Sequence, residues 1–316
     1  MSTAQTTAQT TAVPADGFTG IWYENVGGLD PNSPVPNKYG GGLATYPQQV
    51  GPIAIYRPEV NKTFFSFQHD PGDGFIRHAV SYFDHTTRMV ARPQIWLNNE
   101  TDDAHDAAVI AMDGDGYLYQ FSMTHGEVRR SWIRKSASPY AIDGFVGLLS
   151  KDDPDDMAVF GNPASEPSFS GLPRFSYASA WYVPNAESDD KFLLTHTRYN
   201  NEQRDLYTST SVDADQWMPR RSVAQIERGQ YQTTWLKPDG KTLGTIFNVH
   251  PGGVDRPLDY RSDLYYMQTS DQATTWRTVD DNLLIDNASA PGNPLTSRPQ
   301  SALVYASGPE ERVYLK

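Results

Sequence analysis

Short apolar segments separated by clusters of turn-forming residues run through most of the chain. The clearest segments are rich in aromatic or β-branched residues and are predicted strands: Gly51–Tyr56, Thr63–Phe67, His78–Phe83, Ala107–Met112, Tyr117–Ser122, Phe192–Thr197, Leu206–Ser211 and Leu264–Thr269. The turns between them include Asp113–Gly116 and Pro238–Gly240. Little of the pattern has the period of a helix. Many short strands at close spacing predict an all-β fold, which is a sandwich, a barrel or a propeller.

An internal repeat favours the β-propeller. Five units follow one plan, in which a strand, a polar turn and a second strand make a hairpin: Gly51–Phe67, His105–Ser122, Tyr177–Thr197, Tyr231–Phe247 and Ser301–Leu315. Inner hairpins of one design at intervals of roughly 50–70 residues are typical of propeller blades built from four antiparallel strands. We therefore predict a single propeller domain over residues 17–316, after a flexible lead-in at residues 1–16. The domain is either incomplete at its C-terminus or closed by pairing of its last strand with Thr19–Glu24.

A second signature lies in the turn Thr269–Trp276. This turn resembles the Asp-box, S/T-x-D-x-G-x-T-W, with Ala273 where glycine is usual, and Ser211–Trp217 is a degenerate copy that is one residue short. In such a box the Asp binds backbone amides of a hairpin turn and the Trp packs beneath it. The box is structural and recurs in sialidase-like propellers, away from their active face. It therefore supports the fold and leaves the chemistry to other residues.

Charge and composition limit the expected partners. The net charge of −12 repels polyanions at long range, which argues against nucleic acid, although an anionic polysaccharide can bind where basic residues cluster. The absence of cysteine excludes disulfides and thiolate metal sites. No apolar run approaches the roughly 20 residues of a membrane span. The segment Met1–Ala15 does not have the pattern of a signal peptide. We expect a monomer without a membrane partner.

The repeat also predicts which side chains meet. In a propeller each innermost strand begins at one face near the central channel, so residues just ahead of equivalent strands converge there. His105 and Tyr177 occupy that position in two adjacent units. His125 lies 20 residues after His105, and Arg198 lies 21 residues after Tyr177, each just past the second strand of its hairpin. The sequence therefore predicts two imidazoles, a phenol and a guanidinium on one face.

Three segments carry a resemblance to a known family: Gly41–Phe65, Val80–Tyr117 and Thr124–Ser136. They look like the BNR-repeat family that includes the propeller ulvan lyases, over residues 38–210. The resemblance implies a propeller of seven blades, of which five inner hairpins are visible in the sequence. It also implies β-elimination at a uronic acid of an ulvan-like, sulfated polysaccharide. A secreted or periplasmic protein is implied as well.

The resemblance assigns catalytic roles residue by residue. The family uses a His in an Asp-rich D-x-H stretch, which matches His105. A second His in a G-H-G-like stretch matches His125, with Thr124 in place of the first Gly. A Tyr that opens a later inner strand matches Tyr177, and an Arg in the following strand matches Arg198. These four residues form the predicted catalytic set.

Four further side chains are expected to contact the substrate: Arg204, Tyr182, Tyr231 and His69. Tyr182 is also a rival for the role of catalytic tyrosine, because it lies 16 residues before Arg198. We favour Tyr177, which shares the place of His105 in the repeat.

The elimination chemistry needs these residue types. Removal of the proton next to a sugar carboxylate builds negative charge on that carboxylate, which a guanidinium can hold through two hydrogen bonds. A base must reach the carbon-bound proton and an acid must protonate the departing oxygen, and His suits either task near neutral pH. Tyr can serve when a nearby cation lowers its pKa. The hypothesis is that Arg198 and His125 neutralise the carboxylate. His105 and Tyr177 then exchange protons with the substrate, with base and acid unassigned between them.

Two other functions stay open. A sialidase-like glycoside hydrolase would need three arginines for a carboxylate and a Tyr/Glu pair. Arg57, Arg77 and Arg256 are available, but no such arrangement stands out. A non-catalytic propeller would bind glycans through an aromatic face. No cofactor and no metal site is predicted, and a structural metal ion is left open. Asp113–Gly116 is expected to be a hairpin turn, because the other ligand positions of a calcium loop are absent.

Overall fold

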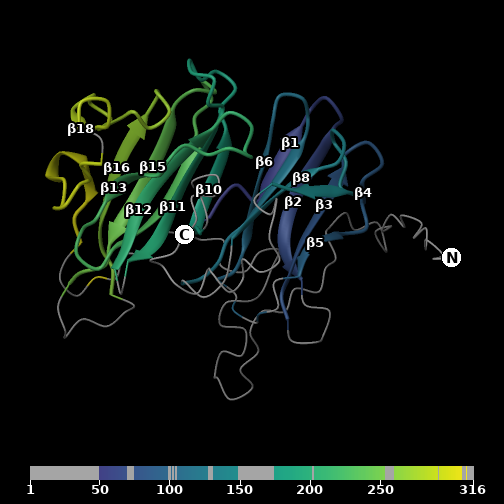
Figure 1. The fold of residues 1–316 in the computed structure, drawn as a ribbon, viewed down its shortest axis with the longest axis horizontal. Helices are drawn as coiled ribbons and strands as arrows, with labels where there is room; N and C mark the ends of the chain where they lie inside the picture. The colour runs from purple at the N-terminus through teal and green to yellow at the C-terminus, as the bar shows by residue number, and fades with distance from the viewer. Residues whose placement is uncertain are drawn as a thin grey trace.

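The computed structural model consists of strands and turns with one short 3₁₀ helix in the part that it describes. That part covers residues 50–69, 75–98, 101, 103, 105–126, 131–148, 174–200, 203–252, 260–290, 292–307 and 311. Its strands form four antiparallel sheets, which we number as blades 1 to 4 in chain order (Figure 1). The all-β fold is therefore confirmed. Among these residues, none of the helical structure is long and apolar enough to cross a bilayer.

Each blade is a separate sheet whose strands follow one another along the chain. Blade 1 contains β1 (Ala54–Arg57), β2 (Lys62–His69), β3 (Arg77–Asp84), β4 (Met89–Val90) and β5 (Gln94–Asn98). Blade 2 contains β6 (Ala108–Met112), β7 (Leu118–Ser122), β8 (Trp132–Ser136) and β9 (Phe145–Gly147). Blade 3 contains β10 (Ser176–Tyr182), β11 (Phe192–Asn200), β12 (Gln203–Ser211) and β13 (Arg221–Ala224). Blade 4 contains β14 (Gln230–Leu236), β15 (Leu243–Val249), β16 (Ser262–Thr269), β17 (Thr275–Arg277), β18 (Leu283–Asp286) and, after the 3₁₀ helix η4 (Gln300–Ala302), β19 (Leu303–Tyr305).

The predicted number of blades is wrong, because the described residues form four blades rather than seven. Four of the five predicted inner hairpins are the β1–β2, β6–β7, β10–β11 and β14–β15 pairs. The fifth unit starts no blade within the described residues. Its first strand, β19, is three residues long and pairs with β16 through Leu264 and Tyr305, so it extends blade 4. A short strand satisfies its backbone hydrogen bonds by pairing with the exposed edge of a nearby strand. The period of the sequence repeat does not show which strand that is.

Some predicted segments lie outside the described residues. These are the lead-in at residues 1–16, the closing strand Thr19–Glu24, the start of the first family-like segment at Gly41–Pro47, and the strand at residues 312–315. The predicted boundaries of the domain therefore stay predictions.

The blades pack face to face through three apolar clusters. Blades 1 and 2 share Phe64, Val80 and Ile110, blades 2 and 3 share Val109, Phe121 and Leu194, and blades 3 and 4 share Leu193, Leu206 and Phe247. A strand covered on both faces reads as a continuous apolar run, which explains why β6, with the sequence AVIAM, is buried at every position. In this packing β10 contacts both β6 and β14, so the starts of three inner hairpins come together.

Acidic side chains hold the hairpin turns. Asp113 Oδ1 accepts the backbone N–H groups of Asp115 and Tyr117 at 3.0 and 2.8 Å, which confirms the predicted turn. Gly116 has a φ of +88°, and a Cβ there would lie 2.4 Å from the ring of Tyr140, so only glycine fits. The β6–β7 hairpin is therefore fixed by its turn sequence.

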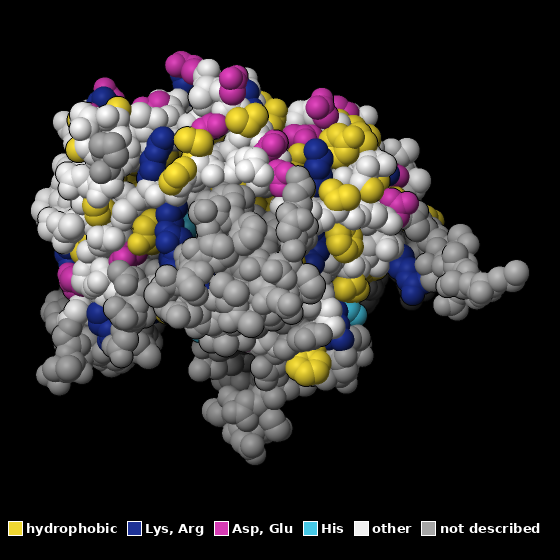
Figure 2. Space-filling view, viewed as in Figure 1, with side chains coloured by type: hydrophobic (Ala, Val, Ile, Leu, Met, Phe, Trp, Pro, Cys, Tyr) yellow, Lys and Arg dark blue, Asp and Glu magenta, His cyan; other side chains and the backbone are white. Residues whose placement is uncertain are grey.

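The two Asp-box-like turns use the same kind of hydrogen bond. Asp271 Oδ1 accepts the N–H of Thr275 at 2.9 Å above the fully buried Trp276, and Asp213 Oδ1 accepts the N–H of Gln216 at 2.9 Å. In the view of Figure 2 many of the acidic side chains lie in the upper part, some of them beside Lys and Arg side chains, and further Lys and Arg side chains lie lower down. Because the excess of acid is unevenly spread, basic residues can still act locally.

Candidate active site

Two histidines from blade 2 stack on each other beside its inner hairpin. His105 precedes β6 and His125 follows β7, and their ring centroids lie 4.1 Å apart with the ring planes inclined by 17°. The centroid of each ring also lies 6.2 Å from that of Tyr177 in β10, in an edge-to-face arrangement. The structure therefore brings together three of the four residues predicted as catalytic, from two adjacent blades. Their roles stay predictions.

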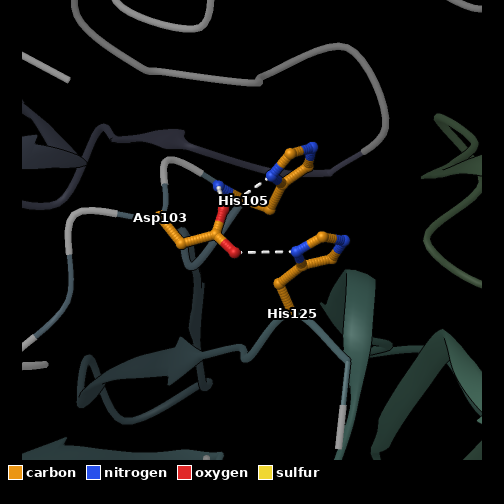
Figure 3. Close-up of side chains that lie close together, drawn as sticks. All are labelled: Asp103, His105 and His125. Carbon is orange, nitrogen blue, oxygen red and sulfur yellow. Dashed lines mark hydrogen bonds and ion pairs between the residues drawn. The ribbon is translucent and has the colours of Figure 1, made fainter. Parts of the chain in front are cut away.

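Asp103 binds both histidines, as Figure 3 shows. Its Oδ1 accepts the Nδ1–H of His105 at 2.6 Å and the backbone N–H of His105 at 3.0 Å, and its Oδ2 accepts the Nδ1–H of His125 at 2.7 Å. Burial alone would raise the pKa of Asp103, but the hydrogen bonds outweigh it and hold that pKa well below its usual range. An ionised carboxylate only accepts, so both Nδ1 atoms carry protons. Both Nε2 atoms point away from the carboxylate and are acceptors in the neutral rings.

A second carboxylate joins the segments that carry the histidines. Asp106 is fully buried, and its Oδ1 accepts the backbone N–H of His125 at 2.6 Å. The Asp106 carbonyl accepts hydrogen bonds from Gln68 Nε2 at 2.7 Å and from His78 Nε2 at 2.6 Å, which link the site to blade 1. Burial lowers the pKa of His78 to about 4, so this side chain is neutral near pH 7. Neither Asp106 nor Asp103 was predicted as part of the site, although both lie beside the first histidine in the sequence.

Tyr177 has an unusual backbone conformation at the start of β10. Its φ is +44°, and the register of β10 against β11 shifts between Ser176 and Ser179, which marks a bulge. Its ring lies against Tyr231 of β14, with centroids 4.8 Å apart, and only 2% of the residue is exposed. Bulges and left-handed conformations of bulky residues concentrate at functional sites, where they re-aim a side chain. The conformation therefore supports a functional role for Tyr177.

A third tyrosine, which was not predicted, completes the cluster. The Tyr199 hydroxyl donates to His125 Nε2 at 3.1 Å, and Tyr199 packs against Tyr177 and Tyr231. Tyr199 pairs with Arg204 across the β11–β12 hairpin. Burial raises the pKa of Tyr199, and the positive charge of Arg204 offsets only part of that effect. The sequence signal that could have found Tyr199 is its place at the end of the second strand of a hairpin.

Two buried guanidiniums lie against Tyr231. The guanidinium carbon of Arg204 is 4.1 Å from the ring centroid and that of Arg261 is 4.6 Å from it. Arg204 Nη2 also donates to His250 Nδ1 at 3.0 Å. Burial alone would raise the pKa of Tyr231, but the two positive charges outweigh it and lower the pKa to about 8. The phenolate form of Tyr231 is therefore accessible close to neutral pH.

Three predicted site residues are not part of this cluster. Arg198 directly precedes Tyr199 in β11, and because successive side chains of a strand point to opposite faces, Arg198 is directed away from the phenols. Tyr182 is the last residue of β10, roughly 16 Å along the strand from Tyr177, so the structure separates the two tyrosine candidates. His69 is the last residue of β2 in blade 1. The cations beside the phenols come instead from β12 and from the segment before β16.

The group formed by Asp103, His105 and His125 could also hold a metal ion. One ligand atom from each residue lies within 4.8 Å of the others, a spacing found only here in the described part of the chain. Two imidazole nitrogens and a carboxylate oxygen suit Zn²⁺ and similar first-row ions. Such an ion would have to replace the Nδ1 protons that now join both rings to Asp103.

Comparisons with known proteins support the fold. No protein-family model matches the chain, and no curated protein sequence matches it. A solved structure of a polysaccharide lyase, an ulvan lyase of family 25, is 17% identical with a TM-score of 0.61 over 85% of this chain and 60% of its own. A second structure of such a lyase, bound to -[GlcA(1-4)Rha3S]-, is 15% identical, with the same TM-score and coverage.

A more distant match is a family 117 glycoside hydrolase from the marine bacterium Zobellia galactanivorans. It is 7% identical, with a TM-score of 0.41 over 73% of this chain and 67% of its own. This TM-score is too low to define a common fold. The chain spans about 60% of the length of the two lyase structures. The likeness to those lyases, at such low identity, shows a shared fold, and membership of the BNR-repeat family stays a prediction.

Proposed function

We propose that this propeller cleaves a uronic-acid-containing polysaccharide by β-elimination at the cluster of His105, His125 and Tyr177. The observation that carries the proposal is that the two histidines, which share the carboxylate of Asp103, lie beside Tyr177. Tyr177 in turn packs on Tyr231, against which two buried guanidiniums lie. Abstraction of a proton beside a carboxylate requires groups that transfer protons near neutral pH next to groups that stabilise negative charge. The likeness in fold to ulvan lyases, one of them bound to -[GlcA(1-4)Rha3S]-, supports a uronate polymer as the substrate class.

The proton transfers are assigned to His105 and Tyr177. The base takes the proton from the carbon beside the carboxylate, a carbon–carbon double bond forms, and the bond to the departing sugar oxygen breaks. The acid then protonates that oxygen, so the reaction needs no further reactant and no cofactor. Either residue can be the base, because a neutral imidazole accepts at Nε2 and a phenol beside cations can lose its proton.

Stabilisation of the negative charge on the intermediate is assigned to His125 and to the two guanidiniums at the phenols. Arg204 and Arg261 are only 6% and 5% exposed, and both lie against Tyr231. They therefore stabilise negative charge on or near the phenols. For Arg198 the sequence had instead predicted direct hydrogen bonds to the substrate carboxylate. In a buried site such charges act more strongly than they would in water.

The place of the reaction follows from the size of the substrate. An intact polysaccharide does not cross a lipid bilayer, so cleavage by this protein is expected in the periplasm or outside the cell.

The test is a panel of uronic-acid polysaccharides assayed for unsaturated products, whose conjugated double bond absorbs in the near ultraviolet. The variant His105→Ala is expected to lose turnover by roughly 10²-fold or more, as is usual when a general acid or base is removed. His85→Ala is the matched control, because His85 is an exposed histidine of blade 1 that is hydrogen-bonded to Thr63. This control is expected to keep wild-type turnover.

Other outcomes would assign the protein differently. New reducing ends without ultraviolet absorbance would identify a glycoside hydrolase, and binding without cleavage would identify a glycan-binding propeller. Elimination at the wild-type rate in His105→Ala would mean that the cluster is not the active site.

A further inference from the structure

One face of blade 4 carries two aromatic rings that lie over a glycine. Trp235 of β14 pairs with Gly244 of β15. Tyr266 of β16 pairs with Ile246, the next residue of β15 on the same face. The two ring centroids lie 5.9 Å apart, with the planes inclined by 34°. A Cβ at position 244 would lie 3.0 Å from both Trp235 Cζ2 and Tyr266 Oη, so the glycine leaves the space that both side chains occupy. We call Trp235 and Tyr266 the aromatic platform.

The platform is open to a ligand. The opposite face of blade 4 is buried against blade 3 through Leu243, Phe247 and Met267. On the platform face Trp235 is 37% exposed and Tyr266 is half-buried. No further blade covers the two rings within the described part of the chain.

Polar groups border the platform. Gln268 Oε1 accepts hydrogen bonds from the Tyr266 hydroxyl at 2.9 Å and from the Lys237 ammonium at 2.5 Å. An ammonium has three donors, so Lys237 can also bind an anionic oxygen. The neighbours of the two rings in the strand ladder are Thr233, Ile246 and Gln268, and none of them is acidic. This part of a chain with a net charge of −12 therefore suits an anionic ligand.

The combination of rings and polar groups differs from the surfaces that pack between blades. Those surfaces are apolar, as at Val109 and Leu194, and charged residues are depleted from the cores of protein interfaces. A sugar ring presents C–H groups on its faces, which pack against the negative face of an aromatic ring. Its hydroxyl and carboxylate groups lie at the edge of the ring, where an ammonium and an amide can bind them. The platform therefore fits an acidic sugar better than a further sheet.

The platform shares a strand with the catalytic cluster. Tyr231 lies near the start of β14, and Trp235 is four residues further along the same face, roughly 13 Å away at the usual rise of a strand. We propose that Trp235, Tyr266 and Lys237 form a second binding site, which holds an acidic sugar of the polysaccharide outside the catalytic cluster. The class of ligand rests on the proposed function, and the site itself rests on the contacts around Gly244 and Gln268.

The test is the retardation of the protein in a native gel that contains ulvan, compared with a gel that contains neutral dextran. Every chain carries His105→Ala, so that the polymer stays intact during the run. Addition of Trp235→Ala is expected to weaken binding to ulvan roughly fivefold or more, because the larger stacking surface is lost. Phe145→Ala is the matched control, since Phe145 is a 40% exposed aromatic residue of β9 in blade 2. This control should be retarded like its parent.

A second pair of variants tests the charge at the platform. Lys237→Gln should weaken binding about twofold at low salt, and the difference should disappear at high salt because ions screen the attraction. Lys241→Gln changes the net charge equally, but the Lys241 ammonium is already paired with Glu187 at 2.5 Å. It should therefore lose less binding. Equal losses in the two variants would show that only the net charge matters and would overturn the site.

Three other results would contradict the proposal. One is unchanged retardation in Trp235→Ala, and another is equal retardation by dextran and ulvan. The third is a dimer that dissociates in Trp235→Ala during analytical ultracentrifugation, because the face would then bind a second copy of the chain. The proposed function is judged separately by ultraviolet absorbance of the products. A protein without elimination activity whose retardation still depends on Trp235 would refute the lyase and keep the platform.

Discussion

Each face of the β11–β12 hairpin has a tyrosine beside a histidine, but the surroundings of the two pairs differ. On one face Tyr199 and Arg204 lie beside His125 and the other phenols. On the opposite face His196 stacks on Tyr207, with ring centroids 5.9 Å apart and planes inclined by 21°. Burial lowers the pKa of His196 to about 3, so this histidine is neutral throughout the physiological range. One face of the hairpin therefore contacts a partly exposed histidine of blade 2, and the other face carries a fully buried histidine of its own.

The difference between the two histidines lies in their neighbours. His125 is partly exposed and its Nδ1 binds the carboxylate of Asp103. His196 is fully buried, and the rings of Tyr207 and Phe175 pack against it. An imidazole needs an acceptor for its proton or contact with water to hold a charge. The residue type therefore does not identify a site until the partner is known.

The largest effect on turnover is expected from replacement of Asp103, the carboxylate that binds both histidines. In Asp103→Asn the side chain keeps its shape, but an amide cannot accept from both Nδ1–H groups with two oxygens as the carboxylate does. Turnover should fall roughly 10²- to 10⁴-fold, because both imidazoles lose their fixed tautomer. The rate of elimination is the measurement, with circular dichroism to check the fold.

Chelation of the wild-type protein tests whether Asp103 is a metal ligand instead. A chelator should leave wild-type turnover unchanged if the carboxylate acts by orienting two protonated nitrogens. Loss of turnover on chelation, with recovery on addition of Zn²⁺, would contradict that role and identify Asp103 as a metal ligand.

The next effect concerns the ionisation of Tyr231. Its pKa of about 8 lies below the ordinary value of 10, so the folded chain releases this proton at lower pH than the unfolded chain. The free energy of unfolding should therefore gain a contribution as the pH rises from about 8 to 10, and this contribution is absent below pH 8. The ionisable groups that face Tyr231 are Arg204, Arg261, Tyr177 and Tyr199.

Two arginine variants compare the faces of the hairpin through this tyrosine. Arg204→Lys should raise the pKa of Tyr231 toward 10, because a flexible ammonium does not reproduce a planar guanidinium against the ring. Arg198→Lys, on the opposite face, should leave it unchanged. Titration of the tyrosinate absorbance gives the pKa, and Tyr231→Phe identifies the signal. An equal shift in both arginine variants would contradict the assignment of Arg198 to the far face.

Sequence patterns predicted the parts of the site that depend on chain order. The repeat placed His105, His125 and Tyr177 together because equivalent positions of adjacent hairpins converge. It could not distinguish Arg198 from Tyr199, because a shift of one residue in a strand reverses the face to which a side chain points. The number of blades came from the resemblance, and the described residues do not support it. The bulge at Tyr177 and the pairing of β19 depend on contacts between segments far apart in the chain.

The smallest effect on turnover is expected at the inert histidine. His196→Gln should keep wild-type elimination and change the pH dependence of stability instead. The folded-state pKa of about 3 lies below the ordinary 6.5, so acidification protonates the unfolded chain first and the free energy of unfolding falls between these values. One proton accounts for at most about 1.4 kcal/mol per pH unit, and denaturant titrations from pH 6 to 4 should show a shallower slope in the variant. A large loss of turnover in His196→Gln would instead mean that the two faces of the hairpin act together, which would contradict the comparison.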